Sequence, residues 1–265
     1  MRQVLFIFIV IGLVSAALWS GDPGVALDRD FHGDAPYLLS DGWIPLLNGS
    51  DLSGWKAQVG RGESLWFTTH AVRFDAEKDP KLLFGAASPG DRIMNGPEGK
   101  TANLVTGMKH GDIELYVEFM VPKGSNSGVY LQGLYEIQVF DSWGVAKPST
   151  TDCGSIYHRW IDEKPVDGSA ARVNASRRPG EWQSFHAWFR APRFDASGKK
   201  TANAQFVKVL HNGILVQENV DLKGGTRSHL PIPEAALNPL MLQGDHGPVA
   251  YRNIYYRPLP PAAGL

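Results

Sequence analysis

The chain has a single cysteine, no excess of charge and, beyond its N-terminus, no long hydrophobic run. The lone Cys153 excludes an intrachain disulfide, and we interpret it as a small buried hydrophobic residue. The formal net charge of −1 gives no general attraction to nucleic acid or to an anionic membrane surface. We therefore expect neither as a partner.

Long helices are also missing from the pattern, because no segment of ten or more residues outside the N-terminal run shows a helical repeat. The 29 glycines and 18 prolines are typical of many turns between short strands. Residues 206–210 and 214–218 flank an Asn212-Gly213 pair, which predicts a β-hairpin. With 265 residues and no internal repeat, the chain is expected to form an all-β sandwich or barrel.

Residues 112–119 show the strongest alternation in the chain. Ile113 and Val117 belong to one face, and Glu114 and Glu118 to the other, which predicts an amphipathic strand. The acidic row could coordinate a cation, but a solvated face of an antiparallel sheet is the favoured interpretation.

The N-terminus resembles a secretory signal. Arg2 precedes an apolar run over residues 4–18, with small residues at 14–16 where a signal peptidase would cleave. The run is shorter than the about 20 residues of a membrane span, although an uncleaved anchor is the alternative. We expect a signal at 1–17, a linker at 18–40, a folded domain at 41–259 and a tail at 260–265. The folded domain would be secreted or periplasmic, with no membrane span after cleavage.

The stretch 125–143 is predicted to form two strands, at 128–132 and 135–140. Alternation places Tyr130 and Gln132 on one face of the first strand, and Glu136 and Gln138 on one face of the second. Amides, a phenol and a carboxylate on one surface suit a polyhydroxylated ligand such as a sugar. The alternative is an ordinary solvent-exposed face. Two further segments, 75–100 and 144–180, read as a long loop and as an irregular segment wrapped over the sheets.

Several segments together resemble one family. They are LNGSDLSGW at 47–55, NSGVYLQGLYEIQVFD at 126–141, PGEW at 179–182, LQGDHG at 242–247 and YRNI at 251–254. Their order and spacing are similar to the 3-keto-disaccharide hydrolase domain, also described as 3-keto-glucoside lyase and 3-keto-glucal hydratase, over about residues 42–259. The resemblance implies an antiparallel two-sheet jelly roll of the concanavalin-like lectin and glucanase type. It also implies an exported enzyme whose substrate is a small carbohydrate oxidised at C3.

The implied chemistry needs a base for the C2 proton, a group that stabilises the enolate oxygen and an acid for the leaving oxygen. Glu136 or His158 is our candidate base, and His246 and Arg252 would act on developing oxygen charge. The candidate substrate-binding residues are Tyr130, Gln132, Gln138, Asp141, Tyr157, Arg190 and Gln243. Structural alternatives are a turn cap for His246, an ion pair for Arg252 and an Asx turn for Asp141.

The same residues bear on two other functions, a glucanase and a sugar-binding module, and on metal binding. A retaining glucanase needs two carboxylates ~5 Å apart, whereas Phe140 lies four positions after Glu136, where the second would stand. A simple glucanase is therefore disfavoured, while a non-catalytic sugar-binding module stays open. His158, His246, Asp141 and Glu136 could hold a divalent metal ion, although no short ligand spacing supports one.

Overall fold

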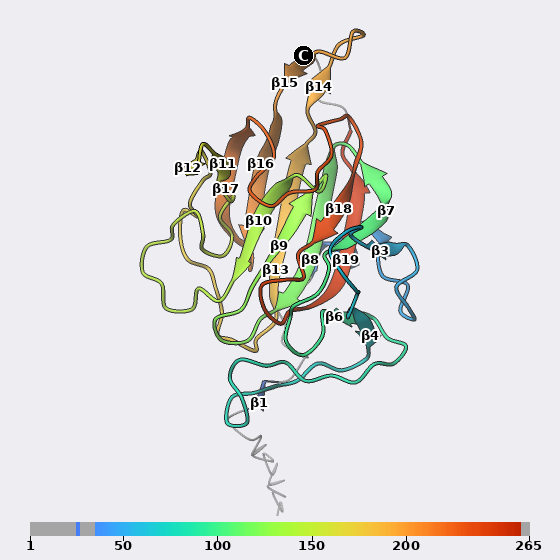
Figure 1. Cartoon of the computed structure of the whole chain (residues 1–265), viewed down its shortest axis with the longest axis vertical. Coiled ribbons are helices and arrows are strands. Elements are labelled where there is room, and N and C mark those ends of the chain that lie inside the picture. Colours follow the sequence, from blue (N-terminus) through green and yellow to red (C-terminus); the bar gives the residue numbers. More distant parts are fainter. Residues whose placement is uncertain (1–24, 27–34, 261–265) are drawn as a thin grey trace, which may run out of the picture.

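In a computed structural model, which describes residues 25–26 and 35–260, the protein is a sandwich of two antiparallel sheets (Figure 1). The smaller sheet has five strands, in the order β10 (Tyr135–Phe140), β9 (Asn126–Leu131), β18 (Asn238–Leu242), β7 (Leu104–His110) and β3 (Trp55–Ala57). The predicted all-β jelly roll is confirmed.

The larger sheet has eight strands. Its order is β17 (Ile214–Leu222), β16 (Ala204–His211), β13 (Gln183–Arg190), β8 (Ile113–Met120), β19 (Ala250–Pro258), β6 (Arg92–Met94) and β4 (Phe67–Thr69), and β2 (Ile44–Pro45) also pairs with β19.

The remaining elements are short. Three two-stranded sheets pair β1 (Val25–Ala26) with β5 (Phe74–Asp75), β11 (Arg159–Ile161) with β12 (Lys164–Val166), and β14 (Arg193–Phe194) with β15 (Lys200–Ala202), and one helical turn, α1, spans Pro36–Leu39. Within the described ranges no helix is long and apolar enough to cross a membrane.

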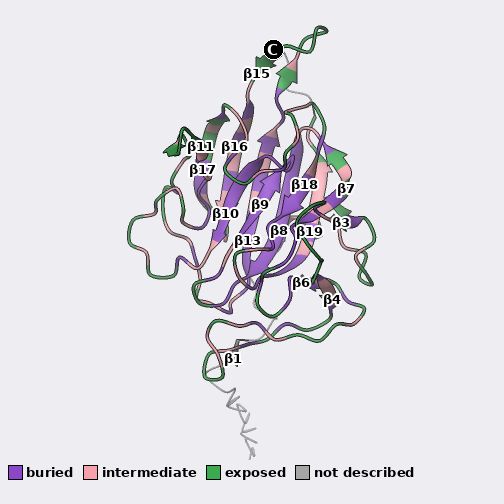
Figure 2. Ribbon diagram, in the orientation of Figure 1, coloured by how far each residue is buried: buried purple, intermediate pink, exposed green. Residues whose placement is uncertain are grey.

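The hydrophobic core lies between the two sheets (Figure 2). Val129 and Ile137 from the five-stranded sheet are completely buried in one cluster with Val117 and Phe119 from the eight-stranded sheet. Burying each such side chain contributes about 1.5–3 kcal/mol. Because strand side chains alternate, the inward rows of β9 and β10 leave their polar rows on the outer face.

The predicted hairpin over 206–218 is confirmed, since β16 and β17 flank Asn212-Gly213. Both turn residues have positive φ, 50° and 79°, which suits Asn and Gly in a type I′ turn.

The prediction that the acidic face of β8 is exposed to solvent is wrong. Glu114 and Glu118 are buried, because arginines from the neighbouring strand β19 pair with them. Arg257 Nε and Arg252 Nε lie 2.6 Å from the respective carboxylates. The face is also covered by residues that precede the expected domain start at 41.

Tyr37, in the turn α1, stacks on Tyr255 of β19 with ring centroids 3.9 Å apart. Part of the expected linker therefore packs against the larger sheet. The expected signal at 1–17 lies outside the described residues.

The segment 144–180 is less irregular than expected. It contains the β11–β12 hairpin, and Ile156 forms antiparallel bridges with Ile137 on one side and Ser169 on the other. The chain around Ile156 thus extends the five-stranded sheet beyond β10. The expected loop at 75–100 likewise contains strand β6.

Candidate functional site

A cavity of about 170 Å³ opens on the outer face of the five-stranded sheet. Six of the site residues predicted from the sequence line it: Tyr130, Glu136, Gln138, Tyr157, Gln243 and His246. Asn126, Arg227 and Ser228 complete the lining. All of these side chains are polar or aromatic, and Glu136 is the one carboxylate among them.

The register of strands β9 and β10 brings Glu136 and Tyr130 together. Glu136 of β10 lies directly opposite Tyr130 of β9, and the Tyr130 phenol, which donates to the backbone carbonyl of Arg227 at 3.2 Å, is also within reach of the Glu136 carboxyl group. The carboxyl group sits over Gly128, where an added Cβ would lie 2.3 Å from Glu136 Oε1. The glycine is required because any side chain at this position would occupy the place of the carboxyl group.

Glu136 has only 2% of its surface exposed. Burial raises its pKa to about 8, although the Tyr130 hydrogen bond acts in the opposite direction. Burial also raises the pKa of Tyr130 well above its usual value, so the phenol keeps its proton and can donate it to the carboxylate. A carboxyl group with a pKa near neutrality is suited to taking up and releasing a proton.

His246 lies across the cavity in the loop between β18 and β19. Its Nδ1 is 2.5 Å from Asp245 Oδ1 and 3.3 Å from Gln243 Nε2. The hydrogen bond and the charge of Asp245 raise the pKa of His246. The imidazole is about half exposed, and its raised pKa favours the protonated form, which can act as an acid.

A buried asparagine fastens the His246 loop. Asn95, which directly follows β6, donates from Nδ2 to the carbonyls of Gly244 and Gly247 at 3.0 and 2.8 Å. Its Oδ1 accepts from the backbone N–H of Val249 at 2.8 Å. The side-chain amide therefore connects the loop that follows β18 of the five-stranded sheet to the end of β6 in the eight-stranded sheet. We call this arrangement the Asn95 clamp.

Two acceptor oxygens of the cavity lack a hydrogen-bond donor from the described protein atoms. They are Oε1 of Gln138 and Oε1 of Gln243, both on buried side chains. Buried amide oxygens are nearly always paired in native proteins. Both side chains line the cavity, where their amides can hydrogen-bond a polar ligand.

Sequence reasoning missed three lining residues. Asn126 could have been found, since alternation places it on the same face as Gly128 and Tyr130. Arg227 and Ser228 lie in the connection between β17 and β18, where no periodicity indicated a position. Tertiary folding brings this connection over β10, and Thr226 Oγ1 there accepts from the Glu136 backbone N–H at 3.2 Å.

Two predicted cationic residues lie on the other sheet. Arg252 of β19 pairs with Glu118 and stacks over Trp182 at 4.2 Å. Arg190 of β13 donates to Asp112 at 2.8 Å. Both have structural ion pairs there, so we do not include them in the site.

Three further predicted residues lie outside the cavity lining. Gln132 has a φ of 54° in the turn after β9 and donates to the carbonyls of His110 and Ala236, because the strand ends one residue before it. Asp141 accepts from the backbone N–H groups of Gly124 and Trp143, as the Asx-turn alternative expected.

His158 is the third predicted residue that lies outside the cavity lining. Its ring stacks on Tyr157 with centroids 4.2 Å apart, behind the cavity wall, and burial together with Arg227 lowers its pKa. Of the two candidate bases, Glu136 alone lines the cavity.

The metal ion considered from the sequence has no assembled site in residues 25–26 and 35–260, where no three His, Cys, Asp or Glu side chains group as ligands. Asp141 in particular is held in its turn, apart from Glu136.

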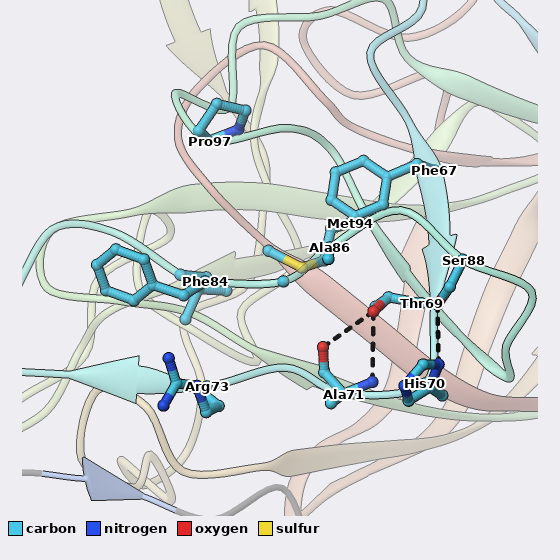
Figure 3. A pocket seen from close by; sticks show the side chains of 12 residues that line it. Phe67, Thr69, His70, Ala71, Arg73, Phe84, Ala86, Ser88, Met94 and Pro97 are labelled. Atoms are coloured by element: carbon cyan, nitrogen blue, oxygen red, sulfur yellow. Dashed lines mark hydrogen bonds between the residues drawn. The ribbon is translucent and has the colours of Figure 1, made fainter.

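A second, larger cavity of about 520 Å³ lies beside β4 and β6. Figure 3 shows its lining, with Phe67, Phe84 and Met94 among the apolar side chains and a hydrogen-bonded pair, His70 and Ser88, at one side. This lining is largely apolar and includes no carboxylate. Its hydroxyl groups are engaged within the protein, Thr69 with the Ala71 backbone and Ser88 with His70, so the cavity is less suited than the Glu136 cavity to binding a polyol.

Comparison with known proteins gives a family match over most of the chain. Residues 42–257 match the 3-keto-alpha-glucoside-1,2-lyase-like domain family. A crystal structure from Parabacteroides distasonis ATCC 8503, provisionally named a glycosyl hydrolase, is 27% identical with a TM-score of 0.59, over 82% of this chain and 84% of that one.

A second structure from that organism, with the same provisional name, is 21% identical with a TM-score of 0.50, over 83% of this chain and all (100%) of that one. This likeness supports the fold alone. No curated protein matches the chain.

Proposed function

Since the chain belongs to the 3-keto-alpha-glucoside-1,2-lyase-like family, a family of carbohydrate-active enzymes, we propose that it cleaves 3-keto-glycosides by elimination followed by hydration. The observation that carries the proposal is the buried carboxyl group of Glu136, with a pKa near 8, in a cavity otherwise lined by hydroxyl-binding side chains.

The first half of the reaction is an elimination. The ketone at C3 acidifies the C2 proton, which passes to the Glu136 carboxylate. The electron pair of that C–H bond forms the C1–C2 double bond, and the C1–O bond breaks with its electrons. The leaving oxygen takes a proton from the imidazolium of His246.

The second half restores the ring. Water adds to the resulting enone: its oxygen bonds to C1, one of its protons passes to the imidazole of His246, and a proton returns to C2 from the Glu136 carboxylic acid. The products are a 3-keto sugar and the free alcohol, so the net reaction is hydrolysis. No nucleophilic side chain is required, in keeping with the single carboxylate of the cavity.

The cavity supplies supporting groups for both halves. Tyr130 holds the carboxyl group of Glu136 by its hydrogen bond. The amide side chains of Gln138 and Gln243 line the cavity and would hydrogen-bond sugar hydroxyls, and the guanidinium of Arg227 is suited to charge that develops on the C3 oxygen.

Turnover of a purified 3-keto-glucoside tests the proposal. Glu136→Gln keeps an acceptor for the Tyr130 phenol but removes the base, so we expect kcat to fall by at least ~100-fold. Glu218→Gln, in an exposed ion pair on β17, is the matched control and should keep full turnover. Binding without turnover in the wild type would indicate a non-catalytic sugar-binding module. Hydrolysis of unoxidised glycosides would indicate a glycosidase.

We also propose that the chain is exported and loses its first 17 residues. N-terminal sequencing of the protein recovered from periplasm or medium tests this. An intact Met1 on the exported protein would contradict cleavage.

A further inference from the structure

Arg227 is the permanently charged cation in the lining of the Glu136 cavity, and its backbone is fixed from two sides. Its N–H donates to the carbonyl of His158 at 2.9 Å, and its own carbonyl accepts from the Tyr130 phenol at 3.2 Å. These bonds fix where the residue enters the site but not where its side chain points. Another contact must set that direction, because an arginine side chain has about 2 kcal/mol of rotamer entropy to lose.

That contact is made by Trp160. The guanidinium carbon of Arg227 lies 4.0 Å from the centroid of the Trp160 ring, well within the about 6 Å over which a cation is attracted to an aromatic face. Within residues 25–26 and 35–260, no carboxylate pairs with this guanidinium. The indole therefore orients the charge without neutralising it, as a carboxylate in its place would do.

Trp160 is unusually exposed for so large an apolar side chain. It lies in β11 opposite Pro165 of β12, and 43% of its surface is exposed. In the described part of the chain it belongs to none of the three hydrophobic clusters. Its ring lies against Arg227 and, with centroids 5.9 Å apart, near His158. Core packing does not account for this tryptophan, whereas the contact with Arg227 does.

An ion-pair network connects the β11–β12 hairpin to the segment that carries Arg227. Arg159 of β11 donates from Nε and Nη2 to Asp167 Oδ2 at 2.8 and 2.6 Å. Lys223, which directly follows β17, has its Nζ 3.6 Å from Asp167 Oδ1. Figure 1 shows β11 and β12 beside β17, where the connection to β18 begins. The contact between Trp160 and Arg227 therefore joins two segments that charged groups also hold together.

The charge of Arg227 acts on groups on both sides of the cavity. Burial raises the pKa of Tyr157, and the Arg227 charge lowers it. The hydrogen bond with Asp245 raises the pKa of His246, and the charges of Arg227 and Arg61 act in the opposite direction. Together with the contact to Trp160, this places the guanidinium at the cavity, between Tyr157 and His246.

We propose that Trp160 is the positioning residue of Arg227, and that its indole face holds the guanidinium at the Glu136 cavity to meet charge that develops on the substrate oxygen. This inference rests on the proposed function. Without the ring, the Arg227 side chain has no contact that keeps it at the cavity rather than in solvent.

Three variants and a control test the proposal. Trp160→Leu keeps an apolar side chain in the hairpin but removes the aromatic face, whereas Trp160→Phe keeps a face. Arg227→Gln removes the cation itself. The control, Trp143→Leu, removes another exposed tryptophan beneath an arginine, Arg178 at 5.4 Å, and it lines a different cavity.

With a purified 3-keto-glucoside, we expect Trp160→Leu to lower kcat at least ~10-fold and to change KM less than ~3-fold, because the lost interaction is made in the transition state. Trp160→Phe should recover most of the turnover, and Trp143→Leu should keep all of it. In the Arg227→Gln background, Trp160→Leu should have no further effect. An equal loss in both backgrounds would show that Trp160 is merely structural, which would overturn the proposal and leave the proposed function standing.

The pKa of His246, measured by NMR titration, gives a second readout that needs no turnover. Trp160→Leu should raise this pKa because the Arg227 charge moves away, Arg227→Gln should raise it at least as much, and Trp143→Leu should leave it unchanged. If no 3-keto-glucoside is turned over, the proposed function fails while the titration still decides the positioning. An unchanged pKa of His246 in Trp160→Leu would contradict it.

Discussion

The environment of Glu136 links the chemistry of one side chain to the stability of the protein. Its carboxyl group is buried in the folded state, with a pKa of about 8, and has an ordinary value near 4.5 when the chain unfolds. The folded protein therefore holds this proton over a pH range in which the unfolded chain releases it. The stability contributed by the neutral acid is complete below pH 4.5 and is lost as the pH rises to about 8.

This linkage predicts a pH-dependent difference between the wild type and Glu136→Gln, whose amide does not titrate. Each pH unit between the two pKa values should favour the variant by up to about 1.4 kcal/mol. Melting temperatures measured from pH 5 to pH 9 should show the variant gaining on the wild type up to about pH 8, with no further gain above it. A constant difference would show that Glu136 ionises normally in the folded state.

Gly128 offers a test of carboxyl placement that leaves Glu136 itself unchanged. The methyl group of Gly128→Ala would meet the flexible end of the Glu136 side chain at 2.3 Å and the Tyr130 ring at 2.8 Å. We expect the carboxyl group to move aside, with turnover reduced at least ~100-fold and a modest loss of stability, about 1–3 kcal/mol.

Gly107→Ala on β7 is the matched control, because its nearest contact would be an ordinary 3.5 Å. Turnover and circular dichroism of both variants separate displacement of the base from unfolding. Full turnover in Gly128→Ala would contradict the assigned position of the carboxyl group.

At the scale of elements, the His246 loop depends on the Asn95 clamp. Asn95→Ala removes three hydrogen bonds and leaves buried backbone groups unpaired, each at a cost of about 1–3 kcal/mol. We expect a lower melting temperature and, at temperatures where the variant is still folded, reduced turnover because His246 is no longer held.

Asn174→Ala provides the comparison. Asn174 donates to the carbonyls of Ser142 and Val145, so it fastens a different loop, away from His246. Calorimetry and turnover should show that both variants are destabilised but that Asn95→Ala alone loses activity in its folded state. Equal activity in the two folded variants would show that the clamp does not position His246.

At the scale of the whole molecule, short strands and frequent turns predicted a sandwich or barrel, the family resemblance implied the two-sheet jelly roll, and alternation predicted the inner and outer faces of β9 and β10. It also identified Glu136, Tyr130 and Gln138, because these residues are local to one hairpin. Arg227 could not be predicted, since it reaches the cavity through tertiary packing of a connection without periodicity.

Burial of the outer faces could not be predicted either. Periodicity reports which residues share a face but not what covers that face. The acidic row of β8 is neutralised by arginines more than 100 positions later in the chain, and Glu136 is covered by connections from two other regions. Arg252 was wrongly assigned to the site for the same reason, because its partner Glu118 is identified only once β8 and β19 are paired.

The Asn95 clamp holds the His246 loop to the end of β6 in the larger sheet, and this has a consequence for how the protein should lose activity on heating. A site carried by a detachable surface loop is inactivated below the melting transition, through local opening. Here the loop can open only if the buried hydrogen bonds of the Asn95 clamp break. Residual activity after brief heating should therefore follow the calorimetric unfolding curve, and inactivation well below that transition would show that the loop moves independently of the sandwich.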